Sequence, residues 1–331
     1  MNLRQIGEFG LIRRIQKKFP ARSSSIFLGL GDDAAAILPS PQKILLLTTD
    51  SLVEEVHFDL SFSTFFQVGY KAMAVNISDI AAMGGTPRFY LVSLGLTDQT
   101  PQEIDRLYRG IQKGGKEAGA ALIGGNTAHS KKTFFVSLTL LGEVPKKEMV
   151  TRGGGRPGDA LYITGSVGDA AAGLEILQKG GGAFQPLIRR YQAPPLRWRE
   201  GRLLAERRIA SAMIDLSDGL SSDLSHIMEQ SGVGAELDLS ALPLSSSLKR
   251  YALQTGNDPL KYALNGGGDY ELLFSVPRKK VKVLDLLIQS GAVAARRIGA
   301  LVHKKRGFTG RDPGGRIRKI EPGGYDHFRR N

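Results

Sequence analysis

The chain has 331 residues, of which 41% are hydrophobic and 23% are charged, so it is long enough for two domains. It contains no cysteine, which excludes disulfides, thiolate metal sites and a thiol nucleophile and favours a cytoplasmic location. The net charge is +13, and the last 35 residues alone carry ten Lys and Arg against three Asp and Glu. This basic end is typical of a solvated surface, with a contribution to binding a phosphorylated ligand as the functional alternative. RNA binding is disfavoured because no aromatic residues interleave with the charges.

The apolar pattern predicts strands that alternate with helices, hence a two-domain α/β (α+β) fold with a mixed N-terminal sheet and an α/β C-terminal domain. An amphipathic helix over residues 1–19 lacks the apolar run of a signal peptide, and no stretch is long enough to span a membrane. The first half is predicted to hold strands at 43–50, 88–96, 121–126 and 133–144 and helices at 65–85 and 101–120.

A segment rich in Lys, Arg, Gly and Pro at 145–159 predicts the domain boundary, which gives domains 1–147 and 148–331. Beyond it the pattern starts again. We expect strands at 160–165, 212–217, 234–239 and 266–277, helices at 169–179, 196–209, 218–232 and 279–291, and two terminal strands.

The stretch FLGLGDDAAAILPS, residues 27–40, fits the dinucleotide-binding pattern G-x-G-x-x-G/A. Such a loop must run into a helix whose N-terminus holds the phosphates, but Pro39 and Pro41 leave no room for one. Asp32 and Asp33 would also repel a pyrophosphate unless a cation lay between them. The stretch is therefore predicted to be strand, turn, strand, with an acidic metal-binding loop as its functional interpretation.

Residues 110–116, GIQKGGK, match the phosphate-binding pattern G-x-x-x-x-G-K. Glu117 stands where the pattern needs Ser or Thr, and the segment continues a predicted helix instead of following a strand. It is not a phosphate-binding loop.

Aspartates repeatedly end apolar elements, where a solvated loop would not need them. They are Asp33, Asp50, Asp79, Asp215, Asp218 and Asp269. Each has a structural alternative, such as helix capping by Asp218 or Asp223. As a set they fit Mg²⁺, which takes oxygen ligands and usually keeps phosphate oxygens in its shell. Glycine turns that let backbone amides approach phosphate, and Arg152 at the boundary, also fit nucleotide chemistry.

Nine segments together resemble one enzyme family. They are GDDAA, TTDSLVEEVHF, YKAMAVNISDIAAMGGTP, IGGNT, RGGGRPGD, YITGSVGDAAAGL, IDLSDGLSSDL, GGGDYELLF and GYDHF. In order, and over nearly the whole chain, they are similar to thiamine-monophosphate kinases. The wider superfamily includes aminoimidazole ribonucleotide synthetase, selenophosphate synthetase and a hydrogenase-maturation enzyme.

The resemblance implies ATP-dependent phosphorylation of thiamine monophosphate to thiamine diphosphate with several Mg²⁺ ions, in a homodimer whose N-terminal domains pair their sheets. It implies an active site in a cleft between the domains. Metal ligands would be Asp33, Thr48, Thr49, Asp50, Asp79, Asn126, Asp215 and Asp218, of which Asp50 and Asp218 are central to catalysis. ATP contacts would be Tyr108, Gly125, Asn126, Arg152 and Ser217. Thiamine-phosphate contacts would be His57, Gly268 and Tyr325.

Two departures from the family pattern remove negative charge. The family usually has Asp at the position of Asn126, and an acidic residue at the position of Gly268. They motivate one alternative, a non-catalytic nucleotide-binding relative. Two others stay open: another ATP-dependent reaction of the superfamily and a basic RNA-binding module.

Overall fold

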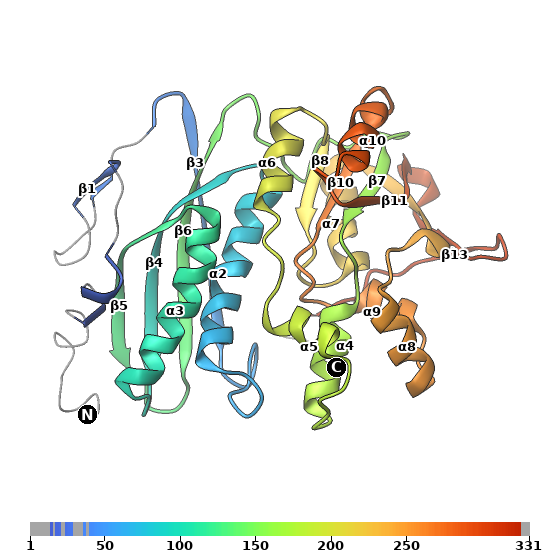
Figure 1. Ribbon diagram of the computed structural model, residues 1–331. Coiled ribbons are helices and arrows are strands. Elements are labelled where there is room, and N and C mark those ends of the chain that lie inside the picture. Colours follow the sequence, from blue (N-terminus) through green and yellow to red (C-terminus); the bar gives the residue numbers. More distant parts are fainter. Residues whose placement is uncertain (1–13, 16, 21–23, 29–35, 38–39, 326–331) are drawn as a thin grey trace. The chain divides into compact units, whose positions relative to one another are not determined.

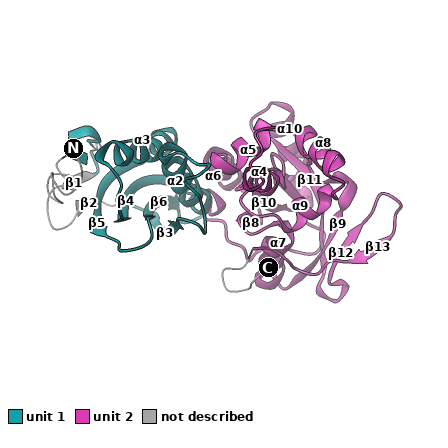
Figure 2. Ribbon diagram, turned by 90° about the horizontal axis from the view of Figure 1, so that it is seen from below, with its two compact units in different colours: residues 1–80, 85–147 teal, residues 81–84, 148–331 magenta. Residues whose placement is uncertain are grey.

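The computed structural model describes residues 14–15, 17–20, 24–28, 36–37 and 40–325. It divides into two compact units: unit 1 comprises residues 1–80 and 85–147, and unit 2 comprises residues 81–84 and 148–331 (Figures 1 and 2). The roles that the sequence assigns to its two domains stay predictions. Among the helices of the described residues, none has the length and hydropathy needed to cross a bilayer.

Unit 1 is built around a four-stranded sheet with the strand order β3-β6-β4-β5. β6 pairs antiparallel with both β3 and β4, and β4 runs parallel to β5. The elements are β1 (Ile26–Leu28), β2 (Ala36–Ile37), β3 (Lys43–Val53), α2 (Phe65–Ala82), β4 (Thr86–Leu96), α3 (Pro101–Ala118), β5 (Ala121–His129) and β6 (Phe135–Pro145). β1 and β2 pair antiparallel, which agrees with strand, turn, strand for the acidic segment. The residues of the predicted turn, with Asp33, lie outside the described part of the chain.

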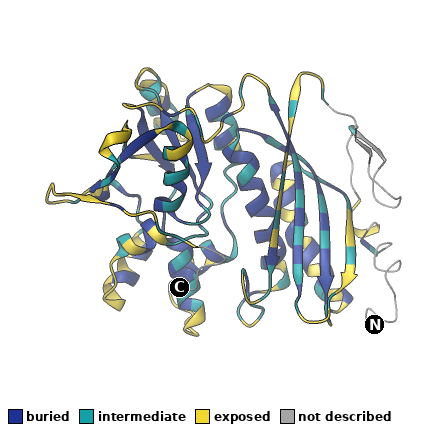
Figure 3. Cartoon of the chain, turned by 180° about the vertical axis from the view of Figure 1, so that it is seen from behind, coloured by how far each residue is buried: buried dark blue, intermediate teal, exposed yellow. Residues whose placement is uncertain are grey.

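Helices α2 and α3 lie on one face of this sheet (Figure 1). Along β3 the side chains alternate between the two faces, so that Thr48 and Asp50 face the helices. In the described part of unit 1, no helix covers the opposite face, which we call the outer face (Figure 3). Leu45 and Leu47 are 41% and 67% exposed on it.

Helix α3 begins with a reciprocal cap. The Thr100 hydroxyl accepts a hydrogen bond from the Glu103 N–H at 3.3 Å, and Glu103 Oε2 accepts one from the Thr100 N–H at 2.7 Å. The helix then runs unbroken to Ala118, which confirms that GIQKGGK is not a phosphate-binding loop.

Replacing Thr100 with Ala removes half of this capping box. We expect the free energy of unfolding to fall by about 1 kcal/mol, measured by urea denaturation. Glu103→Gln keeps an oxygen that can accept the Thr100 N–H and should cost less. An unchanged stability in Thr100→Ala would show that the cap contributes nothing.

Unit 2 contains a seven-stranded sheet with the order β13-β12-β9-β11-β7-β10-β8, antiparallel except between β12 and β9. Its strands are β7 (Ala160–Thr164), β8 (Ala212–Asp215), β9 (Val233–Asp238), β10 (Leu272–Val276), β11 (Ala295–His303), β12 (Phe308–Arg311) and β13 (Ile317–Lys319). Its α-helices are α4 (Asp169–Gln178), α5 (Gln185–Gln192), α6 (Trp198–Glu206), α7 (Leu220–Ser231), α8 (Ser246–Thr255), α9 (Pro259–Asn265) and α10 (Val281–Gln289).

The central strands of this sheet are buried on both faces. All five residues of β7 are buried. Leu161 and Ile163 pack in one apolar cluster with residues of α7, whereas Ala160 and Tyr162 pack in another with residues of α6 and α10. Continuous apolar strands of this kind are expected where helices cover both sides of a sheet.

The structure confirms the predicted α/β fold and corrects details of it. The strand predicted at 266–277 begins only at Leu272, because Gly268 and Tyr270 have φ of 88° and 50°, which no strand allows. Helices α5, α8 and α9 were not predicted. For α9, Asp258 is the N-cap and Pro259 is the first helical residue. This Asp-Pro pair is a sequence signal for a helix start.

Candidate functional site

In unit 1, side-chain oxygens from β3 and α2 lie together on the helix face of the sheet. The Thr48 hydroxyl donates a hydrogen bond to Asp79 Oδ2, and Asp50 follows two residues later on the same face of β3. Burial, together with the charge of Asp79, raises the pKa of Asp50 to about 6. The negative charge of Asp79 disfavours the ionisation of Asp50. A cation bound between the two carboxylates would stabilise their charged forms. Thr49 faces the other way and donates to the Leu138 carbonyl at 3.0 Å.

Other predicted residues of unit 1 lie elsewhere. Asn126 is exposed on β5 and pairs with Ser93, and two strands separate β5 from β3. A Cβ at Gly125 would come within 2.0 Å of the Val92 carbonyl oxygen, so only glycine fits. The ring of Tyr108 is 4% exposed and stacks on Phe19 with centroids 5.3 Å apart. The structure therefore brings Thr48, Asp50 and Asp79 together, but not Asn126 or Tyr108 with them.

The turn after β3 holds His57 firmly. The Val53 N–H donates to His57 Nδ1 at 3.1 Å, and the His57 N–H donates to the Val53 carbonyl at 2.9 Å. Lys71 Nζ, from α2, donates to the His57 carbonyl at 3.1 Å. Because Nδ1 accepts, the neutral imidazole carries its proton on Nε2. Lys71 is not among the predicted site residues, although a lysine within the apolar run VGYKAMAV is a visible signal.

In unit 2, three predicted segments meet at the end of β8. The Gly268 N–H donates to the Ser217 carbonyl at 2.8 Å, and the Tyr325 N–H donates to the Asp218 carbonyl at 3.1 Å. Asp215 ends β8 beside them and is 4% exposed. The structure thus places Asp215, Ser217, Asp218, Gly268 and Tyr325 in one region of unit 2. Arg152 is exposed in the segment before β7.

Asp223 is a residue of this region that the sequence suggested only as a cap. It is 2% exposed and accepts hydrogen bonds from the N–H groups of Asp218 and Gly219 at 3.2 and 3.1 Å. Burial and the charges of Asp215 and Asp218 raise its pKa to about 8. Asp223 therefore fixes the backbone that carries Asp218, and the crowding of three acids again favours a bound cation.

Asp269 anchors the loop that carries Gly268 to the start of α4. Its buried carboxylate accepts the N–H groups of Gly168 and Ala170, at the start of α4, at 2.6 and 3.1 Å. Burial raises the pKa of Asp269 to about 7. Gly268 itself has φ of 88°, so an acidic residue there would strain the loop unless the backbone changed.

No cluster of three or more His, Cys, Asp or Glu side chains suited to one metal ion occurs among the residues that the structure describes. Mg²⁺ does not need one, because it is usually held by one or two carboxylates together with water and substrate phosphate. Asp50 with Asp79, and Asp215 with Asp218, are pairs of that kind. The donor sets present therefore fit Mg²⁺.

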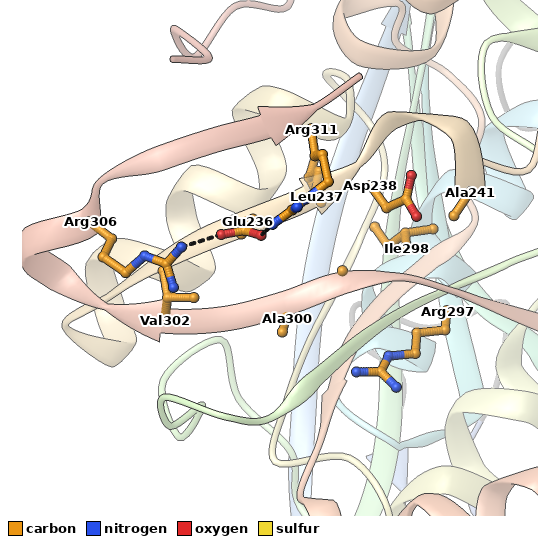
Figure 4. Close-up of a pocket in the computed structure, with 11 residues that line it drawn as sticks. Glu236, Leu237, Asp238, Ala241, Arg297, Ile298, Ala300, Val302, Arg306 and Arg311 are labelled. Atoms are coloured by element: carbon orange, nitrogen blue, oxygen red, sulfur yellow. Dashed lines mark hydrogen bonds and ion pairs between the residues drawn. The ribbon is translucent and has the colours of Figure 1, made fainter. Parts of the chain in front are cut away.

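The basic C-terminal end lines a cavity of about 440 Å³ beside β9, β11 and β12. Glu236 lies between Arg306 and Arg311 and forms an ion pair with each of them (Figure 4). Part of the basic charge is thus neutralised within unit 2. Lys304, Lys305 and Lys319 are exposed, as expected for a solvated surface.

Comparisons with known proteins agree with this architecture. Residues 31–144 match the family model of the AIR synthase related protein, N-terminal domain, and residues 156–311 match that of the C-terminal domain. These matches and the two-unit fold define a protein of the AIR synthase related class.

Relatives within this class identify the family. A thiamine-monophosphate kinase from Aquifex aeolicus is 36% identical over 99% of this chain and 100% of its own length. The crystal structure of thiamine-monophosphate kinase from Stenotrophomonas maltophilia K279a has a TM-score of 0.81 at 33% identity, covering 92% of this chain and 95% of that one. The structure of AaThiL complexed with AMPPCP and TMP has a TM-score of 0.78 at 34% identity, covering 99% of both chains. The chain belongs to the thiamine-monophosphate kinase family, which confirms the resemblance seen in its sequence.

Proposed function

We propose that this protein transfers the γ-phosphoryl group of ATP to thiamine monophosphate and releases thiamine diphosphate and ADP. The observation that carries the proposal is the full-length similarity to thiamine-monophosphate kinases, one relative of which was solved with AMPPCP and TMP. The oxygen-rich ends of β3 and β8 supply the acidic groups that such a reaction needs.

Asp50, Asp79, Asp215 and Asp218 would hold Mg²⁺, with Thr48, Asn126 and Asp33 as further candidate ligands. Thr49 is not proposed, because its hydroxyl faces the other side of β3 and donates to the Leu138 carbonyl. The bound ions would offset the repulsion between two phosphate groups and align them for in-line transfer. Asp223 would keep the Asp218 backbone in place through the two N–H groups that it accepts.

The acceptor needs no general base. A phosphate monoester has a second pKa of about 6, so at neutral pH it is already ionised. Direct attack on the γ-phosphorus then forms the new P–O bond while the bond to ADP breaks. His57 would donate from Nε2 to the thiamine phosphate, with Gly268 and Tyr325 as further contacts. Tyr108, Gly125, Asn126, Arg152 and Ser217 are proposed for ATP.

Under this proposal, thiamine monophosphate should stimulate ADP release from ATP and Mg²⁺, whereas unphosphorylated thiamine should not. Stimulation by a different small molecule would instead favour another reaction of the superfamily. ATP binding without turnover would indicate a non-catalytic relative, and the Asn126→Asp variant would then test whether the missing charge is the reason.

The outer face of the unit 1 sheet is proposed to pair with a second copy of the chain. Leu45 and Leu47 are exposed there on β3, and Leu47 pairs with Leu141 of β6. Two exposed leucines two residues apart on one helix-free sheet face support this proposal. The family resemblance also implies dimers formed by these sheets.

Leu47→Lys is therefore expected to convert the dimer to a monomer, because it places a charge in the buried interface. Sedimentation velocity would measure the change. Leu253→Lys is the matched control, since Leu253 is 86% exposed on α8 and should leave the mass unchanged. A parent protein that sediments as a monomer would contradict the dimer.

A further inference from the structure

Lys71 is a buried cation in the helix that also carries Asp79. Its side chain is 8% exposed, and burial lowers its pKa to about 7. Burying a lysine costs free energy, so a chain retains one only where its contacts compensate or where function requires it.

One contact of Lys71 is specific. Nζ donates to the backbone carbonyl of His57 at 3.1 Å. The bond forms whether the amine is charged or neutral, since both forms carry N–H groups. On its other side His57 is held by Val53, through the N–H and carbonyl bonds described above. The backbone and imidazole of His57 are thus both fixed.

We propose that Lys71 is a positioning residue for the acceptor phosphate: it holds the His57 carbonyl and so keeps the His57 Nε2–H oriented to donate to thiamine monophosphate. The inference rests on the proposed function, which assigns His57 to the substrate. It predicts that Lys71 affects binding of thiamine monophosphate through His57 and leaves ATP binding unaffected.

The test is a double-mutant cycle of Lys71→Met and His57→Ala, read as KM for each substrate. Lys71→Met keeps the length of the side chain without the donor. It should raise KM for thiamine monophosphate about tenfold, because a misoriented His57 loses its one hydrogen bond to the substrate phosphate. KM for ATP should change less than twofold. In the His57→Ala background, Lys71→Met should add less than twofold, because contacting residues are not additive.

Two further variants sharpen the comparison. Lys71→Gln retains an N–H donor on a shorter side chain and should recover part of the loss. Lys113→Met removes an exposed lysine from α3 of the same unit and should change neither KM. If Lys71→Met does not fold, Lys71→Leu, which also lacks a donor, takes its place in the cycle.

Histidine-selective NMR of the protein alone gives a readout that needs no activity. The His57 imidazole should be the Nε2–H tautomer in both proteins, because Val53 donates to Nδ1. Its ring signals should shift in Lys71→Met, because the His57 carbonyl is no longer held. An unchanged KM for thiamine monophosphate in folded Lys71→Met, or equal effects of that change in both backgrounds, would overturn the inference. If the parent forms thiamine diphosphate but His57→Ala leaves KM unchanged, the inference fails and the proposed function stands. If the parent forms none, the proposed function fails and so does this role of Lys71.

Discussion

Asp218→Asn and Asp50→Asn should each lower kcat for thiamine diphosphate formation by on the order of 100-fold or more. Each change keeps the size of the side chain and removes one negative charge from a proposed metal ligand. Asp218 lies beside Asp215 and the buried Asp223, whereas Asp50 lies beside Asp79. The measurement is the steady-state rate of product formation over a range of Mg²⁺ concentrations.

Both variants should remain folded. Removing a charge from a crowded acidic cluster relieves repulsion, so the free energy of unfolding without metal should not fall. Asp98→Asn is the matched control, because Asp98 is exposed in the segment between β4 and α3 and should keep the full rate. A full rate at limiting Mg²⁺ in Asp218→Asn or Asp50→Asn would show that the metal assignment is wrong.

Glu271→Ala is expected to destabilise the protein by about 3–5 kcal/mol, because it leaves two cations without their buried partner. Glu271 is 0% exposed. Arg197 donates to it through Nε at 2.6 Å and Nη2 at 3.0 Å, Arg190 donates through Nη2, and the Thr164 hydroxyl donates at 2.6 Å. Chemical denaturation would measure the loss.

The loss of Glu271 should also affect the loop that carries Gly268, which is proposed to contact the substrate. Glu271 follows Asp269 and Tyr270 directly, so disorder at Glu271 should also loosen the loop that carries Gly268. Glu271→Gln, which keeps the shape and one acceptor oxygen, should lose less stability than Glu271→Ala. Glu200→Ala removes only the Arg197–Glu200 pair of 2.7 Å and should cost about 1 kcal/mol or less. A loss below 1 kcal/mol in Glu271→Ala would contradict this account.

The sequence predicted elements with a strong local pattern. α2 was expected over 65–85 and spans Phe65–Ala82, and β3 was expected over 43–50 and spans Lys43–Val53. The GGGDYEL segment is predicted as strand, but Gly268 and Tyr270 have positive φ. Asp269 accepts hydrogen bonds from Gly168 and Ala170 at the start of α4, about 100 residues earlier in the sequence. Periodicity within a segment contains no information on such contacts.

The same limit applies to the candidate site. The occurrence of aspartates in apolar elements and the family resemblance indicated Asp50 and Asp79, and the fold places both on the helix face of unit 1. The strand order, which puts Asn126 on β5 across two strands from β3, could not be read from the sequence. The supporting roles of Lys71 and Asp223 depend on backbone groups that the fold brings to them. Lys71 binds the His57 carbonyl, and Asp223 binds the N–H groups of Asp218 and Gly219.

Direct transfer of the γ-phosphoryl group from ATP to thiamine monophosphate is the step on which the proposed function depends. The most direct measurement uses ATP labelled with heavy oxygen in that group, with Mg²⁺ and thiamine monophosphate, and identifies the product by mass spectrometry. We expect thiamine diphosphate whose terminal phosphoryl group carries the full label. No thiamine diphosphate, or diphosphate without the label, would contradict the account.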